Sequence, residues 1–226
     1  MSIKANLASL IQQIIAAEQR FARKPGQVRL MVVSKNQPIS KLQEAIAAGQ
    51  AVFGENYVQE ALPKMAALAG QPLEWHFIGA IQSNKTRQIA ENFQWVHSVE
   101  NLRIAERLSA QRPANLADLN ICIQVNIDEE DTKAGVALPQ LFELAQAIVK
   151  LPRLKLRGLM AIPIAKIDFN AQRETFRKLR FALENLQQQG LAVDALSMGM
   201  SDDFPAAIAE GATIIRVGTA IFGKRG

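Results

Sequence analysis

Lys35 ends a strongly apolar segment near the start of the chain, and Arg216 lies in a similar segment near its end. Lys35 follows residues 30–33 and Ser34, while Arg216 lies in Ile214-Ile215-Arg216-Val217-Gly218-Thr219. Unbroken branched apolar runs are typical of parallel strands covered on both faces. α/β folds build sites at the C-terminal ends of such strands. An amine and a guanidinium at one sheet edge indicate a ligand with a carbonyl and anionic or aromatic groups.

Lys35 could also be an ordinary surface lysine, and Arg216 could also be a structural arginine. A lysine chosen at random is a surface residue, but a lysine at the end of a buried strand can form a Schiff base when its amine is partly deprotonated. Arg216 could form a salt bridge with Asp202 or Asp203. We expect ligand contact instead, because a glycine-containing loop converges on the same place.

The loops after the last two predicted strands have the composition of a phosphate site. They read Met198-Gly199-Met200-Ser201-Asp202-Asp203 and Val217-Gly218-Thr219-Ala220. Glycine allows close backbone approach, Ser201 and Thr219 offer hydroxyls, and each loop opens a helix whose N–H groups favour an anion. In (β/α)8 barrels these two loops are the recurrent phosphate site.

The two histidines and the single tyrosine are expected to have structural roles. His76 and His97 are the only histidines and follow neighbouring strands, but without a suitably spaced carboxylate they make no convincing zinc site. We expect both to be hydrogen-bonded structural residues, although His76 could act on a ligand. Tyr57, the only tyrosine, is expected to pack.

The charged residues that follow Gly54 and the single cysteine are not expected to take part in ligand chemistry. Glu55, Glu60 and Lys64 have the spacing of a solvated helix face with i, i+4 pairing. Cys122, the only cysteine, lies inside an apolar run and is expected to be a small buried hydrophobic residue. A single cysteine excludes an intramolecular disulfide and fits a reducing compartment.

The elements that must position these residues alternate regularly along the chain. Strands are predicted at 28–34, 51–54, 73–78, 94–98, 119–126, 154–160, 192–197 and 213–217. Helices are predicted at 3–23, 39–48, 56–69, 82–91, 100–111, 138–150, 169–189 and 203–209. Several of these helices stop at glycine, as expected for helix termination.

Eight strands in strict alternation with helices predict an α/β protein with a single (β/α)8 TIM-type barrel and an additional N-terminal helix. The barrel is expected to occupy residues 1–226 as one domain. A doubly wound open sheet is the alternative, but the dinucleotide fingerprint G-x-G-x-x-G is absent.

Composition narrows the possible partners and compartment. The net charge is +5 and the pI is near 9.5, but the lysines and arginines are scattered along the chain and form no basic arm. We therefore expect no nucleic-acid partner. No apolar stretch is long enough to cross a membrane, and the first twenty residues lack the apolar core of a signal peptide. We therefore expect a cytoplasmic protein.

Six segments together resemble the pyridoxal phosphate homeostasis proteins, the YggS/PROSC family. They are Val33-Ser34-Lys35, Phe53 to Glu60, Trp75 to Gly79 with Gln82 and Asn84-Lys85, Gly158-Leu159-Met160, Ser197 to Asp203, and Arg216 to Gly223. The segments span essentially the whole chain in the right order.

The resemblance implies a barrel like the N-terminal domain of alanine racemase that binds pyridoxal 5'-phosphate (PLP). Lys35 matches the lysine that carries PLP as a covalent aldimine. Ser201, Gly218 and Thr219 match the phosphate cradle, and Arg216 matches the arginine that faces the pyridine nitrogen. Asn56 and Met160 match positions near the cofactor. Lys133 keeps the lysine of a further motif, in which Thr132 departs from the usual serine.

The resemblance favours a PLP carrier over an enzyme. Such a protein buffers the reactive aldehyde, supports vitamin B6 and amino-acid homeostasis, and has no catalytic residues and no metal. An arginine opposite the pyridine nitrogen disfavours its protonation and weakens the electron sink.

The alternative is an amino-acid racemase-type enzyme. In alanine racemases a tyrosine supplied with a C-terminal β-domain acts on the second face, and here Tyr57 is in the wrong segment. Expected partners of the carrier are PLP and related B6 vitamers, with transient contact with apo PLP-dependent enzymes. Without the second domain we expect a monomer.

Overall fold

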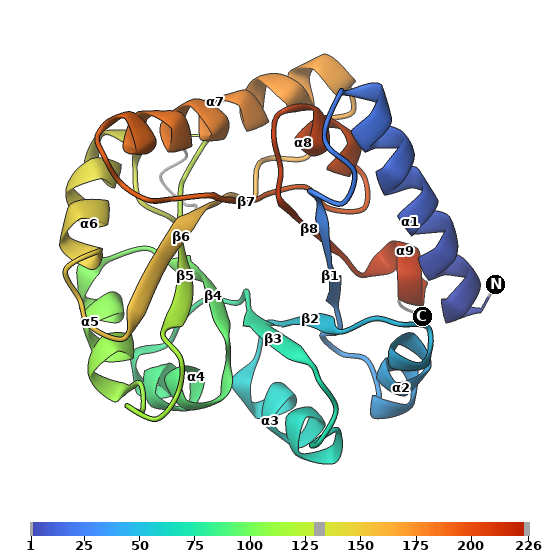
Figure 1. Ribbon diagram of the computed structural model, residues 1–226, viewed down its shortest axis with the longest axis horizontal. Coiled ribbons are helices and arrows are strands. Elements are labelled where there is room, and N and C mark those ends of the chain that lie inside the picture. Colours follow the sequence, from blue (N-terminus) through green and yellow to red (C-terminus); the bar gives the residue numbers. More distant parts are fainter. Residues whose placement is uncertain (1, 129–133, 224–226) are drawn as a thin grey trace.

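The computed structural model describes residues 2–128 and 134–223, so the prediction for Lys133 lies outside the described residues. The strands are β1 Arg29–Val33, β2 Val52–Glu55, β3 Glu74–Phe77, β4 Trp95–Val99, β5 Leu119–Gln124, β6 Leu154–Met160, β7 Ala195–Ser197 and β8 Ile214–Val217. All pair in parallel in sequence order, and β8 pairs with β1 to close the barrel (Figure 1). The predicted barrel is confirmed, and the open sheet is excluded.

Helices surround the strands on the outside of the barrel (Figure 1). They are α1 Ile3–Arg20, α2 Ile39–Ala47, α3 Val58–Ala67, α4 Thr86–Asn92, α5 Leu102–Gln111, α6 Leu141–Ile148, α7 Phe169–Gln188, α8 Phe204–Ala209 and α9 Thr219–Phe222, with 3-10 turns η1 Ser83–Lys85 and η2 Leu138–Gln140. The opening helix ends at Arg20, earlier than predicted. The short helix α9 was not among the predicted helical segments.

The additional N-terminal helix packs beside the last elements of the barrel. The Ser2 hydroxyl accepts the Ala5 N–H at 3.2 Å and caps α1. The apolar stripe that α1 buries consists of Ile3, Leu7, Leu10, Ile14 and Ala17. Asn6 donates its side-chain amide to the Ile221 carbonyl at 2.8 Å, so α1 holds α9 at the closing edge of the barrel (Figure 1).

A packed layer of side chains forms part of the barrel core. Its buried members are Met31, Val52, Trp95, Cys122, Met160, Ala195 and Ile214. Cys122 is fully buried, which confirms its predicted packing role, and burial raises the pKa of its thiol to about 12. The interior of a TIM-type barrel is filled by side chains in this way, so its site forms at the C-terminal ends of the strands and not in a central pore.

Gly158 on β6 lies where the backbone of β7 approaches very closely. It pairs with Ala195 on β7, and a Cβ added to it would lie 1.9 Å from the Ala195 carbonyl oxygen. The register between β5 and β6 also shifts here, between Ile121 and Cys122. A side chain at this position would push β6 away from β7.

Candidate ligand-binding site

A cavity of about 270 Å³ lies at the C-terminal ends of β1, β7 and β8. Five of the predicted site residues line it together: Lys35, Ser201, Arg216, Gly218 and Thr219. The other lining residues are Val33, Gln37, Met200, Asp202 and Gly223. Its volume is near the lower end of the range of small-ligand pockets, roughly 300–1,000 Å³.

Gly218 allows the ends of β1 and β8 to come close together. A Cβ at Gly218 would lie 2.9 Å from the Val33 carbonyl oxygen and 3.3 Å from the Val33 Cβ. Any side chain here would force the two strand ends apart. The absence of a side chain therefore brings the Thr219 hydroxyl and the residue after β1, Ser34, to the same edge of the barrel.

The loop between β7 and α8 is shaped by Gly199 and Asp203. Gly199 has a φ of +93°, and a Cβ there would lie 2.6 Å from the Ala207 Cβ, so α8 packs directly on this backbone. The Gly199 carbonyl accepts the Arg216 backbone N–H at 2.9 Å, and Asp203 Oδ1 accepts the Met200 N–H at 2.6 Å. These bonds hold the loop at the cavity that Ser201 lines.

The Arg216 guanidinium is held by three hydrogen bonds to Ser197 and Ala161. Nη1 donates to the Ser197 carbonyl at 2.6 Å and to Ser197 Oγ at 2.9 Å, and Nη2 donates to the Ala161 carbonyl at 2.9 Å. Burial lowers the pKa of Arg216 to about 10, against the opposing charge of Asp203, so it stays protonated at neutral pH. Among the described carboxylates none is within ion-pair distance of Arg216, so the salt-bridge alternative is not supported.

A buried charged cluster, here called the Lys64 cluster (Lys64, Glu55, Glu60 and Ser34), supports the backbone around Lys35. Lys64 Nζ donates to the Ser34 carbonyl at 2.8 Å, to Glu55 Oε1 at 2.8 Å and to Glu60 Oε1 at 2.7 Å. Ser34 Oγ also donates to Glu55 Oε1 at 2.6 Å.

The Lys64 cluster also reaches the other side of Lys35, because the Asn36 N–H donates to Glu60. Both backbone neighbours of Lys35 are thus fixed to one ionic group. The predicted i, i+4 pair between Glu60 and Lys64 exists, but the prediction of a solvated face was wrong, since the Lys64 and Glu55 side chains are 5% and 0% exposed.

Burial raises the pKa of Glu55, although hydrogen bonds from Lys64 and Ser34 act in the opposite direction. Glu55 Oε2 has no hydrogen-bond partner in the structure. The strand predicted at 51–54 stopped one residue short of Glu55, which in the structure is the last residue of β2, a strand whose every residue is buried.

The two remaining predicted site residues lie away from this cavity. Asn56 lines a neighbouring cavity of about 420 Å³, together with the exposed side chain of Tyr57 and with Lys85. Met160 ends β6 and is fully buried in the barrel core. Neither lines the cavity that contains Lys35.

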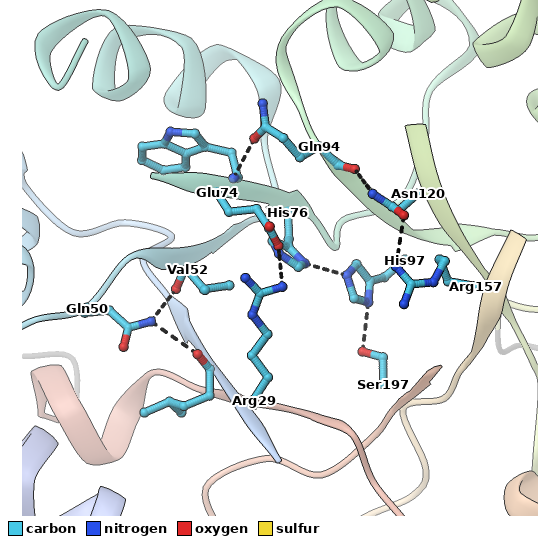
Figure 2. Close-up of polar contacts among 12 residues, drawn as sticks. Arg29, Gln50, Val52, Glu74, His76, Gln94, His97, Asn120, Arg157 and Ser197 are labelled. Carbon is cyan, nitrogen blue, oxygen red and sulfur yellow. Dashed lines mark hydrogen bonds and ion pairs between the residues drawn. The ribbon is translucent and has the colours of Figure 1, made fainter. Parts of the chain in front are cut away.

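The histidines lie inside the barrel and not on its C-terminal face. His76 is the third residue of β3, and both His76 and His97 are fully buried. His76 Nδ1 and His97 Nε2 are 2.8 Å apart, and His97 Nδ1 lies 2.8 Å from Ser197 Oγ (Figure 2). The interpretation of both as hydrogen-bonded residues is confirmed, and both His76 ring nitrogens are engaged.

In the part of the chain that the structure describes, no group of three histidine, cysteine, aspartate or glutamate side chains is suited to hold a metal. Over the same residues, no helix combines the length and apolar character needed to cross a membrane.

The cavity combines groups that suit one ligand chemistry. The amine of Lys35 can condense with a carbonyl, the hydroxyls of Ser201 and Thr219 can donate to an anion, and Gly218 lets that anion approach the backbone. The buried guanidinium of Arg216 can donate to an aromatic nitrogen. These residues fit a phosphorylated aromatic aldehyde.

Comparison with known proteins agrees with the fold. The family model of the alanine racemase N-terminal domain matches residues 6–226. The chain is 55% identical to the pyridoxal phosphate homeostasis protein of Pseudomonas aeruginosa, over 99% of this chain and 96% of that protein. It is 50% identical to the Escherichia coli protein of the same name, over 99% and 97% of the two chains.

Among solved structures, PipY of Synechococcus elongatus with PLP bound superimposes with a TM-score of 0.86 at 40% identity. The match covers 98% of this chain and all of PipY. The shared barrel, the near-complete coverage and these identities show that the chain belongs to the pyridoxal phosphate homeostasis protein family, whose barrel is that of the alanine racemase N-terminal domain.

Proposed function

We propose that this chain binds PLP as a Schiff base on Lys35 and carries it without catalytic turnover. The observation that supports this most strongly is the convergence of Lys35, Ser201, Arg216 and Thr219 on one cavity. Relatives named pyridoxal phosphate homeostasis proteins and the PLP-bound PipY structure support the same ligand. The role is to buffer a reactive aldehyde for vitamin B6 and amino-acid homeostasis in the cytoplasm.

Each residue has a distinct task in this proposal. The Lys35 amine attacks the aldehyde carbon, and a carbon–nitrogen double bond replaces the carbonyl as one water leaves. Ser201 and Thr219 donate hydroxyl hydrogens to the phosphate, and Gly218 leaves room for it. Arg216 donates to the ring nitrogen. When bound, PLP supplies an electrophilic aldehyde and an electron-accepting ring.

Two features of the site favour a carrier over a racemase-type enzyme. Arg216 is the charged residue at the ring nitrogen in this proposal, and its positive charge opposes ring protonation and so weakens the electron sink. From the sequence His76 could act on a ligand, but its side chain is fully buried and both of its ring nitrogens are hydrogen-bonded. General acid–base catalysis needs a group within reach of the reacting atom.

Borohydride reduction followed by peptide mass mapping tests the attachment site. The pyridoxyl group is expected on Lys35 and is expected to be absent in Lys35→Ala. Lys85→Ala is the matched control, because Lys85 lines the neighbouring cavity. A dominant adduct on Lys85 or another lysine of the unmodified protein would reject the assignment.

Deuterium exchange at the α-carbon of L- and D-amino acids, followed by NMR with excess protein and PLP, tests the absence of turnover. No exchange above that of free PLP is expected. Fast exchange that is lost in Lys35→Ala would make the protein an enzyme and overturn the carrier assignment.

A further inference from the structure

A line of five hydrogen-bonded side chains crosses the interior of the barrel to the proposed ligand site. This relay consists of Glu74, His76, His97, Ser197 and Arg216, from β3, β4, β7 and β8. Figure 2 shows its course from Glu74 to Ser197. The successive distances are 2.6 Å, 2.8 Å, 2.8 Å and 2.9 Å.

The two ends of the relay lie in different environments. Glu74 is the first residue of β3, is 29% exposed, and forms an ion pair with Arg29 at 2.7 Å. Arg216 is buried and lines the cavity at the opposite ends of the strands. The relay therefore connects a solvent-accessible carboxylate at one end of the barrel with the cavity at the other.

The chemistry of the two ends restricts the direction of the hydrogen bonds between them. A guanidinium can only donate and a carboxylate can only accept. Ser197 Oγ accepts from Arg216, and we infer that its own hydrogen is donated to His97 Nδ1, which lies 2.8 Å away. In this direction of the relay, His97 donates from Nε2 to His76 Nδ1, and His76 donates from Nε2 to Glu74, at the short distances observed.

This pattern requires both imidazoles to be neutral. Burial lowers the pKa of His97 well below its usual value, and the nearby His76 and Arg216 act in the same direction. Burial also lowers the pKa of His76, although Glu74 opposes this. The plane of the His76 ring is fixed further by Trp95, which stacks on it with ring centroids 5.4 Å apart and an angle of 5°.

The relay helps to compensate the buried positive charge of Arg216, which forms no direct ion pair with a described carboxylate. No described carboxylate is within ion-pair distance of Arg216, although the charge of Asp203 acts on it from farther away, and a buried charge with incomplete compensation is unfavourable. Hydrogen bonds in a chain polarise one another, so the negative charge of Glu74 strengthens Ser197 Oγ as an acceptor for Arg216. Ser197 and the Ala161 carbonyl also set the direction in which the remaining N–H groups of Arg216 point.

We propose that His97, His76 and Glu74 are positioning residues, which act through Ser197 to aim Arg216 at the ring nitrogen of the ligand. The relay thus recognises a heteroaromatic nitrogen acceptor at the cavity. The identity of the ligand rests on the proposed function, whereas the direction of the relay does not. A purely structural network would stabilise the barrel but would not distinguish ligands by their ring atoms.

The direction of the relay is testable on the protein alone. The chain has only two histidines, so 15N-histidine labelling gives an unambiguous imidazole NMR spectrum. Both rings are expected to be neutral at pH 7, with hydrogen on Nε2. Either ring protonated on Nδ1, alone or in addition, would overturn the proposed relay whether or not PLP binds.

The effect on recognition is measured with two probes: PLP, and the analogue in which a C–H group replaces the ring nitrogen. The unmodified protein is expected to bind PLP at least about tenfold more tightly, as befits one hydrogen bond from a charged donor. His97→Phe is expected to reduce this ratio about tenfold, and Glu74→Gln to reduce it in the same direction by less.

Asp194→Asn is the matched control, because Asp194 pairs with Arg157 and is not bonded to the relay. It is expected to leave the ratio unchanged. Equal loss of affinity for both probes in His97→Phe and Glu74→Gln would refute a positioning role and leave a structural one. If His97→Phe does not fold, Glu74→Gln decides by the same ratio. If the unmodified protein binds neither probe, the proposed function fails, while the histidine spectrum still judges the relay.

Discussion

Replacing Lys64 with methionine should destabilise the protein strongly, although Lys64 lies outside the proposed site. Lys64 makes three hydrogen bonds in the Lys64 cluster, and it pairs with the fully buried carboxylate of Glu55. Removing one partner of a buried ion pair leaves an uncompensated charge and costs about 3–5 kcal/mol. Glu60 is partly exposed and can be hydrated, so its lost pairing adds little.

The loss should depend on pH, with a definite sign. Burial raises the pKa of Glu55, and the hydrogen bond from Lys64 opposes that increase. Without Lys64 the pKa of Glu55 should rise further. A carboxyl group with a raised pKa in the folded state favours folding fully below its unfolded value, about 4.5, and this contribution is lost as the pH rises through the folded value.

Urea unfolding at pH 5 and pH 8 measures this dependence. Lys64→Met should lose more free energy of unfolding at pH 8 than at pH 5, relative to the unmodified protein. The double variant Glu55→Gln/Lys64→Met should recover much of the loss, since no buried charge remains. Lys178→Met, on an exposed part of α7, is the control and should change stability by less than about 0.5 kcal/mol.

The reasoning would be refuted by a loss below about 1 kcal/mol at pH 8, or by an equal loss at both pH values. Either result would mean that Glu55 is not held as a charged group by Lys64.

Three further predictions concern other parts of the barrel. Gly158→Ala should prevent normal folding, because its Cβ would lie 1.9 Å from the Ala195 carbonyl oxygen; circular dichroism and expression yield check this, and Gly26→Ala, which adds backbone strain at a φ of +76° without any crowding, should still fold. Ser201→Ala should weaken PLP binding about tenfold through one lost hydrogen bond to phosphate, while binding of the unphosphorylated aldehyde pyridoxal stays unchanged; equal weakening of both would place Ser201 elsewhere. Glu210→Gln should destabilise the protein near neutral pH, since burial raises the pKa of Glu210 but hydrogen bonds from surrounding arginines lower it overall. The contribution of the Glu210 carboxylate to stability is present above its unfolded pKa, near 4.5, and is lost as the pH falls through its lower pKa in the folded state. The unfolding curves of the variant and the unmodified protein should therefore converge in acid.

The barrel could be predicted from the sequence because each strand is a compact apolar run and each run alternates with a helical pattern. The same periodicity identified the strand ends, and hence the joint position of Lys35, Arg216 and Gly218. Five of seven predicted site residues line one cavity for this reason. A helix was expected to open at the loop of Gly218 and Thr219, but the bounds of α9 could not be predicted because four residues carry too little periodicity.

Residues that point into the barrel were harder to predict. His76 was expected on the C-terminal face, but it lies within β3 and faces His97, a contact between residues 21 positions apart. Lys64 and Glu55 have the spacing of an exposed pair, and only the tertiary packing of α3 on β2 buries them. Periodicity gives the position of a residue along an element, but not the polar partners that another element brings to it.

The burial of Cys122 has a consequence for a protein that handles an aldehyde. Thiols add readily to aldehydes, and the reactive species is the thiolate. The single cysteine of this chain is sealed in the barrel core with its pKa near 12, so thiolate is essentially absent at neutral pH. The chain therefore presents no thiol that could compete with Lys35 for the proposed ligand, and oxidants that modify exposed thiols should leave binding of that ligand intact.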